Sequence, residues 1–164
     1  MSDELSDAFR REAGSILGFF IRRDVAPVDA ADLVSEAFLA AWKSSRRSTI
    51  EPAMLRAWLF GIARNVLSQY RRGRTRRSAL ADRLRWTLDE AHVQTATEPT
   101  LAEHIRELIR QLPEIDREIV QLVYWDGFTQ EEVATIIGKP ATVVRARLSR
   151  ARGVLREQLA ESDD

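Results

Sequence analysis

Arginine side chains dominate the last part of the chain, and their spacing suggests contact with a polyanion. Between Val133 and Arg156 the sequence contains several basic residues and no acidic one. Arginine can form two hydrogen bonds to guanine O6 and N7, and it also binds phosphate oxygens. A helix that is merely solvated usually carries acids that pair with its bases, and none is present here. The segment therefore predicts a DNA-binding helix.

The residues around this segment have the order of a helix-turn-helix. Thr129 and Glu132 form a capping box that begins one helix, and Gly138 suits its left-handed end. After a short turn, a second helix with the apolar residues Val144 and Leu148 would enter the major groove. The candidate contacts to DNA are its polar side chains and those of the turn: Lys139, Thr142, Arg145, Arg147, Ser149, Arg150 and Arg152.

The charges of the chain are segregated although the formal net charge is zero. Residues 43–85 and 133–156 are strongly basic, whereas residues 1–42 and 86–132 are acidic. A solvated surface without a partner would mix the two signs. Two separate contacts with a polyanion therefore explain the pattern better.

The first basic block contains the second candidate DNA surface. A helix that begins near Pro52 has an apolar face between Leu55 and Tyr70. Its opposite face is polar and cationic, and consists of Arg64, Asn65, Ser68, Arg71 and Arg72. Trp58 and Tyr70 fall on the apolar face, so we expect them in the core rather than stacked on bases.

Helical periodicity and the lack of a convincing strand predict an all-α fold. We expect two small helical domains, residues 1–77 and 101–164, joined by a flexible linker over residues 78–100, with some helix near 79–88. Further predicted helices cover residues 3–23, 29–43, 101–112 and 116–125. The first of these ends at the Asp24–Pro27 segment, and Asp29 would cap the second. Residues 44–51 would form a loop.

Composition excludes several classes of site. The chain has no cysteine, and His92 and His104 stand apart, so we expect no metal and no cofactor. No catalytic triad or glycine-rich phosphate loop accompanies the carboxylates, which disfavours an enzyme. The charged N-terminus lacks the layout of a signal peptide, and no apolar run is long enough to cross a bilayer. We therefore expect a soluble intracellular protein.

Motifs in both halves of the chain resemble those of bacterial sigma factors. Asp32–Trp42 resembles conserved region 2.2, and Arg56–Asn65 resembles the helix of regions 2.3–2.4. The matches to region 4 are Leu112–Pro113, Arg117, Tyr124–Phe128, Gln130–Ala134 and Arg145–Arg152. With only these two regions and a short linker, the chain is similar to the compact extracytoplasmic-function (ECF) sigma factors.

This resemblance implies that the protein binds core RNA polymerase, recognises two promoter elements and helps to open the duplex, without chemistry of its own. Asp32, Leu33 and Glu36 would contact the clamp coiled coil of the largest polymerase subunit. Phe38 and Trp42 lie in the same segment, but we expect them in the hydrophobic core. The family commonly has glutamine where this chain has Ser35, which leaves that contact unassigned.

The resemblance also assigns the two DNA surfaces. Arg46 and Arg47, in the loop, with Arg64, Asn65, Arg71 and Arg72 would contact the minus-ten element. The helix-turn-helix would read the minus-thirty-five element. Val143 and Ala146 replace polar residues that are usual in the family, so the promoter sequence is not transferable from relatives.

The resemblance also implies an inhibitor, and the sequence leaves two alternative functions open. An anti-sigma factor is the expected inhibitor of this cytoplasmic protein, and it could hold the protein near the membrane. A freestanding repressor or activator is the main alternative, and it would bind duplex DNA tightly without polymerase, often as a dimer on a palindrome. An enzyme is the third hypothesis.

Overall fold

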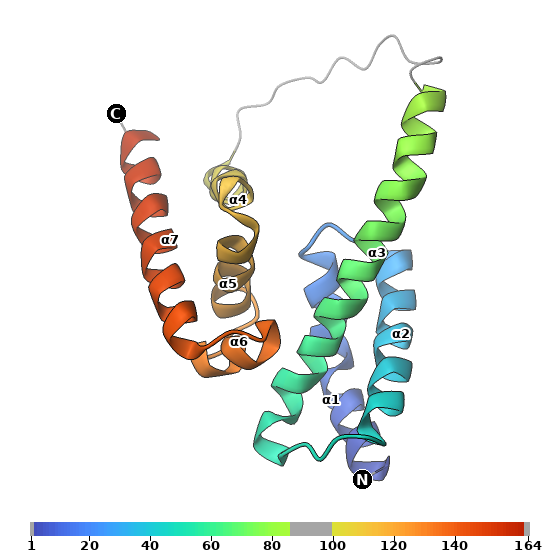
Figure 1. The fold of residues 1–164 in the computed structure, drawn as a ribbon. Coiled ribbons are helices and arrows are strands. Elements are labelled where there is room, and N and C mark those ends of the chain that lie inside the picture. Colours follow the sequence, from blue (N-terminus) through green and yellow to red (C-terminus); the bar gives the residue numbers. More distant parts are fainter. Residues whose placement is uncertain (1, 86–99, 163–164) are drawn as a thin grey trace. The chain divides into compact units, whose positions relative to one another are not determined.

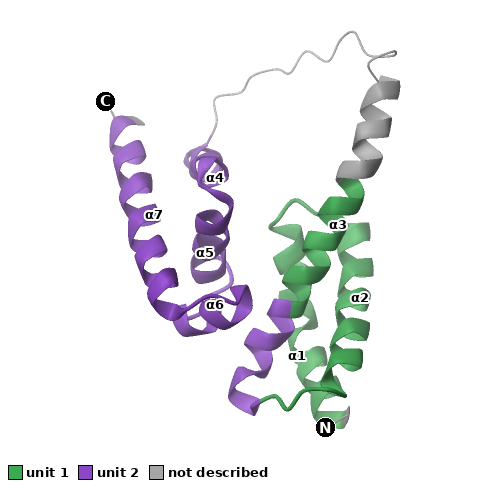
Figure 2. Cartoon of the chain, viewed as in Figure 1, with its two compact units in different colours: residues 1–50, 62–97 green, residues 51–61, 98–164 purple. Residues whose placement is uncertain are grey.

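The computed structural model describes residues 2–85 and 100–162, with side chains for residues 3–74 and 100–161. Within these ranges every regular element is a helix, which confirms the predicted all-α class (Figure 1). Contacts divide the chain into two compact units (Figure 2). Unit 1 contains residues 1–50 and 62–97, and unit 2 contains residues 51–61 and 98–164.

Unit 1 is built from α1 (Ser2–Ile21), α2 (Pro27–Ser45) and the part of α3 (Leu55–Arg85) that follows Gly61. The two N-terminal helices pack against each other along their apolar stripes. The core of this unit consists of Leu5, Ala8, Phe9, Ile16, Phe19, Phe20, Val25, Ala30, Leu33, Ala37, Ala41, Ala63, Val66 and Leu67. Burial of these side chains, more than helix propensity, stabilises the helices.

The turn between α1 and α2 confirms the predicted break but not the predicted cap. Asp24 adopts a left-handed backbone with φ of 64°, and α2 begins at Pro27. The prediction that Asp29 is the N-cap is wrong, because the fixed φ of proline already suits the first helical position. Ala26 is the N-cap residue, and Asp29 lies in the first turn of the helix.

The helix α3 is longer than its apolar pattern predicts. A single 3-10 turn, Pro52–Met54, leads into it, and it continues beyond Gly73 to Arg85. One glycine costs about 1 kcal/mol in a helix, and the arginines, alanines and leucines that follow it are good helix formers. The expected linker therefore begins with helix at residues 78–85, and the rest of it up to residue 99 lies outside the described residues.

Unit 2 carries four helices in its described C-terminal part: α4 (Leu101–Gln111), α5 (Glu114–Tyr124), α6 (Gln130–Ile137) and α7 (Ala141–Ser162). The predicted capping box is confirmed, because Thr129 Oγ1 accepts from the amide of Glu132 at 3.2 Å and the Glu132 carboxylate accepts from the Thr129 amide at 2.8 Å. Gly138 ends α6 with φ of 67°, as a left-handed C-cap requires.

The core of unit 2 holds the helix-turn-helix together. The helix α7 packs against both α5 and α6, and α4 closes the arrangement against α5 and α7. The buried apolar residues of these helices are Leu108, Ile109, Leu112, Ile119, Val120, Leu122, Val133, Ile136, Ile137, Val144, Leu148 and Ala151. One face of α7 is therefore buried in the core, and this packing determines which of its side chains are exposed to solvent.

Candidate nucleic-acid interface

One stripe of α7 contains three of the predicted contacts of the helix-turn-helix, together with Arg156. Arg145, Ser149, Arg152 and Arg156 recur at the spacing of a single helical face, next to the buried stripe that contains Leu148. Arg145, Ser149 and Arg156 are exposed, and Arg152 is half-buried. We call these four residues the arginine stripe.

The residues at the start of α7 are also accessible. Lys139 lies in the turn after α6, and Thr142 lies in the first turn of α7, and both side chains are exposed. In a helix-turn-helix, the N-terminal residues of the second helix reach the base edges. Lys139, Thr142 and Arg145 are therefore in position to meet a duplex first.

Arg147 takes part in an ion pair that the sequence analysis does not predict. Its Nη1 lies 2.8 Å from Oδ1 of Asp116, which is only 5% exposed and lies in the first turn of α5. This ion pair uses one nitrogen of a side chain that is 35% exposed. Arg147 therefore links α7 to α5, and its contact with DNA stays a prediction.

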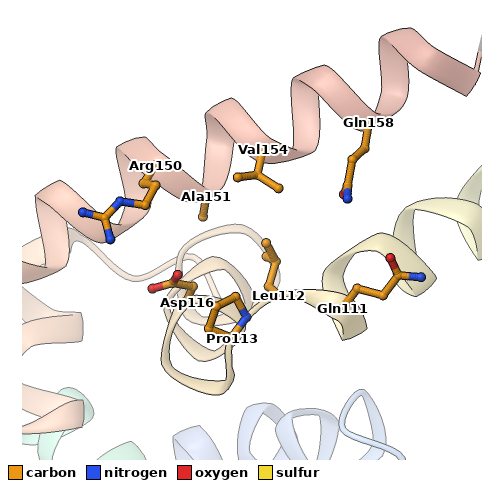
Figure 3. Close-up of a pocket in the computed structure, with 8 residues that line it drawn as sticks. All are labelled: Gln111, Leu112, Pro113, Asp116, Arg150, Ala151, Val154 and Gln158. Carbon is orange, nitrogen blue, oxygen red and sulfur yellow. The ribbon is translucent and has the colours of Figure 1, made fainter.

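Arg150 remains exposed, on the same side of α7 as Arg147 and away from the arginine stripe. Figure 3 shows Asp116 below the α7 ribbon, in a pocket that Arg150 and Ala151 also line. The predicted DNA contacts of α7 thus occupy two flanks of the helix, with Arg150 on one and the arginine stripe on the other.

The predicted minus-ten surface lies on α3 and on the loop before it. Asn65 and Arg72 are exposed, and Arg64 is half-buried. Arg71 is exposed, but its Nη2 donates to the carbonyl oxygen of Arg23 at 3.3 Å, which ties it to the turn before α2. Arg71 can therefore present only part of its guanidinium to a ligand.

The loop after α2 exposes its two arginines. Arg46 is the C-cap residue of α2, and Arg47 follows in a turn in which its amide donates to the carbonyl of Ser44 at 3.0 Å. Neither side chain is buried, so both are accessible to phosphates. Their backbone is held by the end of α2, which gives the loop a defined beginning.

Tyr70 is half-buried rather than a full core residue, and it joins α3 to α2. Its hydroxyl donates to Oδ2 of Asp29 at 2.6 Å, and the Arg74 guanidinium carbon lies 5.9 Å from its ring centroid. The hydrogen bond to Asp29 raises the pKa of Tyr70, and burial and the negative charge of Asp29 add to the effect. This bond fixes how the cationic face of α3 lies against α2.

We expect the Tyr70→Phe variant to lose about 1–2 kcal/mol of stability at neutral pH, because one hydrogen bond to a charged group is removed. The raised pKa means that the bond stabilises the fold fully below the unfolded-state value of about 10 and less as pH rises through the folded-state value. Urea denaturation at several alkaline pH values measures both effects. The pH dependence above about pH 10 should weaken in the variant, and equal slopes would contradict this assignment.

The predicted polymerase contacts of α2 separate into exposed and buried residues. Asp32 and Glu36 are exposed, one turn apart. Leu33 is only 3% exposed, because it faces the core between α1 and α2. We therefore correct Leu33 from a binding residue to a core residue.

An exposed leucine that the sequence reasoning missed lies on the same face as the two acids. Leu39 is 56% exposed, and it follows Asp32 and Glu36 at the i, i+4, i+7 spacing of one stripe. The ring of Phe38 points elsewhere and packs edge-on against Phe9, with centroids 4.8 Å apart. Helical periodicity could have identified Leu39, because it places residue 39 on a different face of the helix from the buried positions 33, 37 and 41.

In the part of the chain that the structure describes, no three His, Asp or Glu side chains are grouped so that they could hold a metal ion. Among the described helices, none has the length and apolar character of a bilayer span. What the arrangement offers instead is two cationic helix faces and one acidic–apolar stripe.

Comparisons with known proteins identify the family of the chain. Residues 8–77 match the family model for sigma-70 region 2, and residues 102–155 match that for sigma-70 region 4. The ECF RNA polymerase sigma factor EcfG of Rhodopseudomonas palustris is 32% identical over 157 residues, which cover 94% of this chain and 84% of that protein. The probable RNA polymerase sigma factor RfaY of Xanthomonas campestris is 33% identical over 88% of this chain, which spans only 37% of that relative's length.

A solved structure shows the same fold. The sigma factor RpoE of Bartonella quintana, crystallised in complex with the anti-sigma factor NepR, is 26% identical, with a TM-score of 0.67. The match covers 94% of this chain and 96% of that one. Together with the matching models for regions 2 and 4, these relatives establish the family. The chain belongs to the ECF family of RNA polymerase sigma factors.

Proposed function

We propose that this protein directs core RNA polymerase to specific promoters by holding promoter DNA with two surfaces. The observation that carries the proposal is the arginine stripe, exposed on the second helix of a helix-turn-helix in a segment without acids. Lys139, Thr142, Arg145 and Ser149 would read the minus-thirty-five element as duplex, and Arg150, Arg152 and Arg156 would contact its backbone. No catalytic step of its own is required.

The second DNA surface would serve the minus-ten element, where the strands separate. Arg64, Asn65, Arg71 and Arg72 form a cationic face on α3, and Arg46 and Arg47 are available in the loop before it. A cationic groove that follows the backbone is the sequence-independent part of single-strand binding. We place the capture of an unpaired base in the loop of residues 46–51.

The polymerase-binding surface would be the exposed stripe of α2 that contains Asp32, Glu36 and Leu39. It combines two negative charges with an accessible apolar side chain, which suits a partner with basic residues around an apolar patch. The partner would be the clamp coiled coil of the largest subunit. In this scheme region 2 corresponds to residues 1–77, the linker to 78–100 and region 4 to 101–164, and the family-model ranges support this division.

An anti-sigma factor would keep the protein inactive by covering these surfaces. The Bartonella relative was crystallised with such an inhibitor, which supports the idea for a chain of the same fold. We propose that this exchange takes place in the cytoplasm, where the polymerase is. Purification of the protein from its native cell should recover polymerase and inhibitor in separate complexes.

Transcription in vitro with purified core polymerase tests the proposal directly. The folded chain, free of inhibitor, should make the core enzyme initiate at a defined set of sites in native genomic DNA. Tight duplex binding by the protein alone, with no effect on initiation, would instead indicate a freestanding regulator. Absence of any initiation site would refute the sigma-factor role.

We expect the double substitution Asp32→Arg with Glu36→Arg to weaken binding to core polymerase by about a hundredfold or more, since like charges across an interface cost several kcal/mol. Both residues are exposed, so the fold should be retained. Fluorescence anisotropy with labelled protein and core enzyme measures the affinity.

The matched control is Asp3→Arg with Asp7→Arg on α1, which makes the same charge change at the same spacing on exposed positions. It should leave the affinity within about threefold of the parent, as exposed charges outside an interface contribute little. Equal losses in both variants would mean that net charge alone, rather than the α2 stripe, controls binding.

A further inference from the structure

An exposed aromatic side chain lies beside the arginine stripe. Tyr124 is the last residue of α5 and is 56% exposed, although Ile119 and Val120 on the same helix are buried. Its hydroxyl accepts a hydrogen bond from Nε of Arg152, and the Arg152 guanidinium carbon lies 5.5 Å from the ring centroid. We call these two residues the Tyr124–Arg152 pair.

The pair keeps donors that its own hydrogen bond does not use. Arg152 spends only Nε on the tyrosine, so its two terminal NH₂ groups still carry donors. The Tyr124 oxygen accepts this bond, so its own proton is free to be donated. Accepting from a cation also polarises the hydroxyl and makes it a better donor. A phosphate oxygen is the ligand that suits a guanidinium edge next to a phenol O–H.

The position of the pair along α7 places it near a DNA backbone. Arg152 is two helical turns beyond Arg145 on the same stripe, a distance of about 10.5 Å at 1.5 Å per residue. Only the N-terminal residues of such a helix reach the base edges, so Arg152 lies beyond that part of the helix and is in a position to meet phosphates.

We propose that Tyr124 is a further DNA contact of the helix-turn-helix, and that it binds one backbone phosphate of the upstream promoter element together with Arg152. This inference rests on the proposed function of the helix-turn-helix. Contact with the ring restricts the guanidinium before DNA arrives, so less side-chain freedom is lost on binding. The pair positions the protein on the duplex and does not read its sequence.

The test uses holoenzyme, made from core polymerase and the full chain, and a promoter duplex that the parent holoenzyme selects from native DNA. Single methylphosphonate linkages, which carry no charge, replace each phosphate of the upstream element in turn. Parent holoenzyme should lose affinity at several linkages. With Tyr124→Phe, affinity for the unmodified duplex should fall about 10- to 100-fold, as expected for one hydrogen bond to a charged group.

The decisive readout is the pattern of sensitive linkages. At one linkage that matters for the parent, the affinity lost on removing the charge should be smaller for Tyr124→Phe and for Arg152→Gln, and it should vanish in the double variant. Arg106→Gln, which removes one exposed charge from α4, is the control and should keep the parent pattern.

Two results overturn different claims. If Tyr124→Phe keeps the parent pattern at every linkage, the inference about Tyr124 is wrong while the proposed function stands. If the parent itself is insensitive at every upstream linkage, the proposed role of the helix-turn-helix fails. Thermal unfolding followed by circular dichroism should be the same for the parent and the four variants, since each substituted side chain is at least partly exposed.

Discussion

Arg147→Met is expected to destabilise unit 2 by about 2–4 kcal/mol, because it leaves the Asp116 carboxylate buried without its partner. The Asp116 side chain is only 7% exposed, and the ion pair to Arg147 is 2.8 Å long. Asp116 lies in the first turn of α5, where the positive end of the helix dipole favours a carboxylate. This position offsets part of the free energy lost when Asp116 has no partner. Urea denaturation followed by circular dichroism measures the loss.

The two partners of this ion pair should not be equivalent. The Arg147 side chain is 35% exposed, so water can reach its guanidinium when Asp116 is replaced. Asp116→Asn should therefore cost less than Arg147→Met, at about 1–2 kcal/mol. Replacing both residues should cost less than the sum of the two single changes, because neither charge is then left unpaired.

The same variants decide whether Arg147 also contacts DNA. A structural ion pair predicts that Arg147→Met leaves the salt dependence of promoter binding unchanged, whereas a lost phosphate contact lowers its slope by about one unit. Arg150→Met is the matched control, since its exposed side chain lines the same pocket, and it should change stability by less than about 0.5 kcal/mol. Normal stability of Arg147→Met with a reduced slope would support the assignment made from the sequence.

The helix-turn-helix could be predicted from the sequence because the ends of its helices are determined by residues close together in the chain. The Thr129–Glu132 capping box and the left-handed Gly138 are formed within a few residues, so sequence reasoning found both. The exposed positions Arg145 and Ser149 also follow from the spacing of the buried Val144 and Leu148. For these residues, the periodicity of one helix is enough to predict which side chains are exposed.

The features that the sequence analysis missed depend on partners that are distant in the chain. Arg147 and Arg145 have the same side chain, but only Arg147 pairs with Asp116, 31 residues earlier. Asp29 lies in the first turn of α2, and its carboxylate accepts a hydrogen bond from Tyr70, 41 residues away. Leu33 was named through a motif, although its exposure is decided by packing between α1 and α2. Tertiary contacts of this kind leave no local pattern to detect.

Arg145→Glu is expected to abolish recognition of the upstream element with little effect on fold or on polymerase binding. The side chain is exposed in the N-terminal half of α7, where helix-turn-helix proteins contact base edges. Loss of a bidentate contact to guanine costs about 1–3 kcal/mol, and the new negative charge adds repulsion from nearby phosphates. We therefore expect holoenzyme affinity for the upstream element to fall by more than about a hundredfold.

Three measurements separate this effect from misfolding and from a general loss of charge. Thermal unfolding and affinity for core polymerase should match the parent, since residue 145 is far in sequence from α2 and its side chain is at the surface. Arg106→Glu, with the same charge reversal on α4, should retain promoter binding.

The Arg145→Ala variant shows whether Arg145 contacts a base or only the DNA backbone. It should relax discrimination at one base pair of the upstream element, because a base contact specifies sequence whereas a phosphate contact weakens all sequences equally. A uniform loss over all sequences would make Arg145 a backbone contact. The reading of bases would then depend on Lys139, Thr142 and Ser149, the other exposed polar residues of this part of the helix-turn-helix.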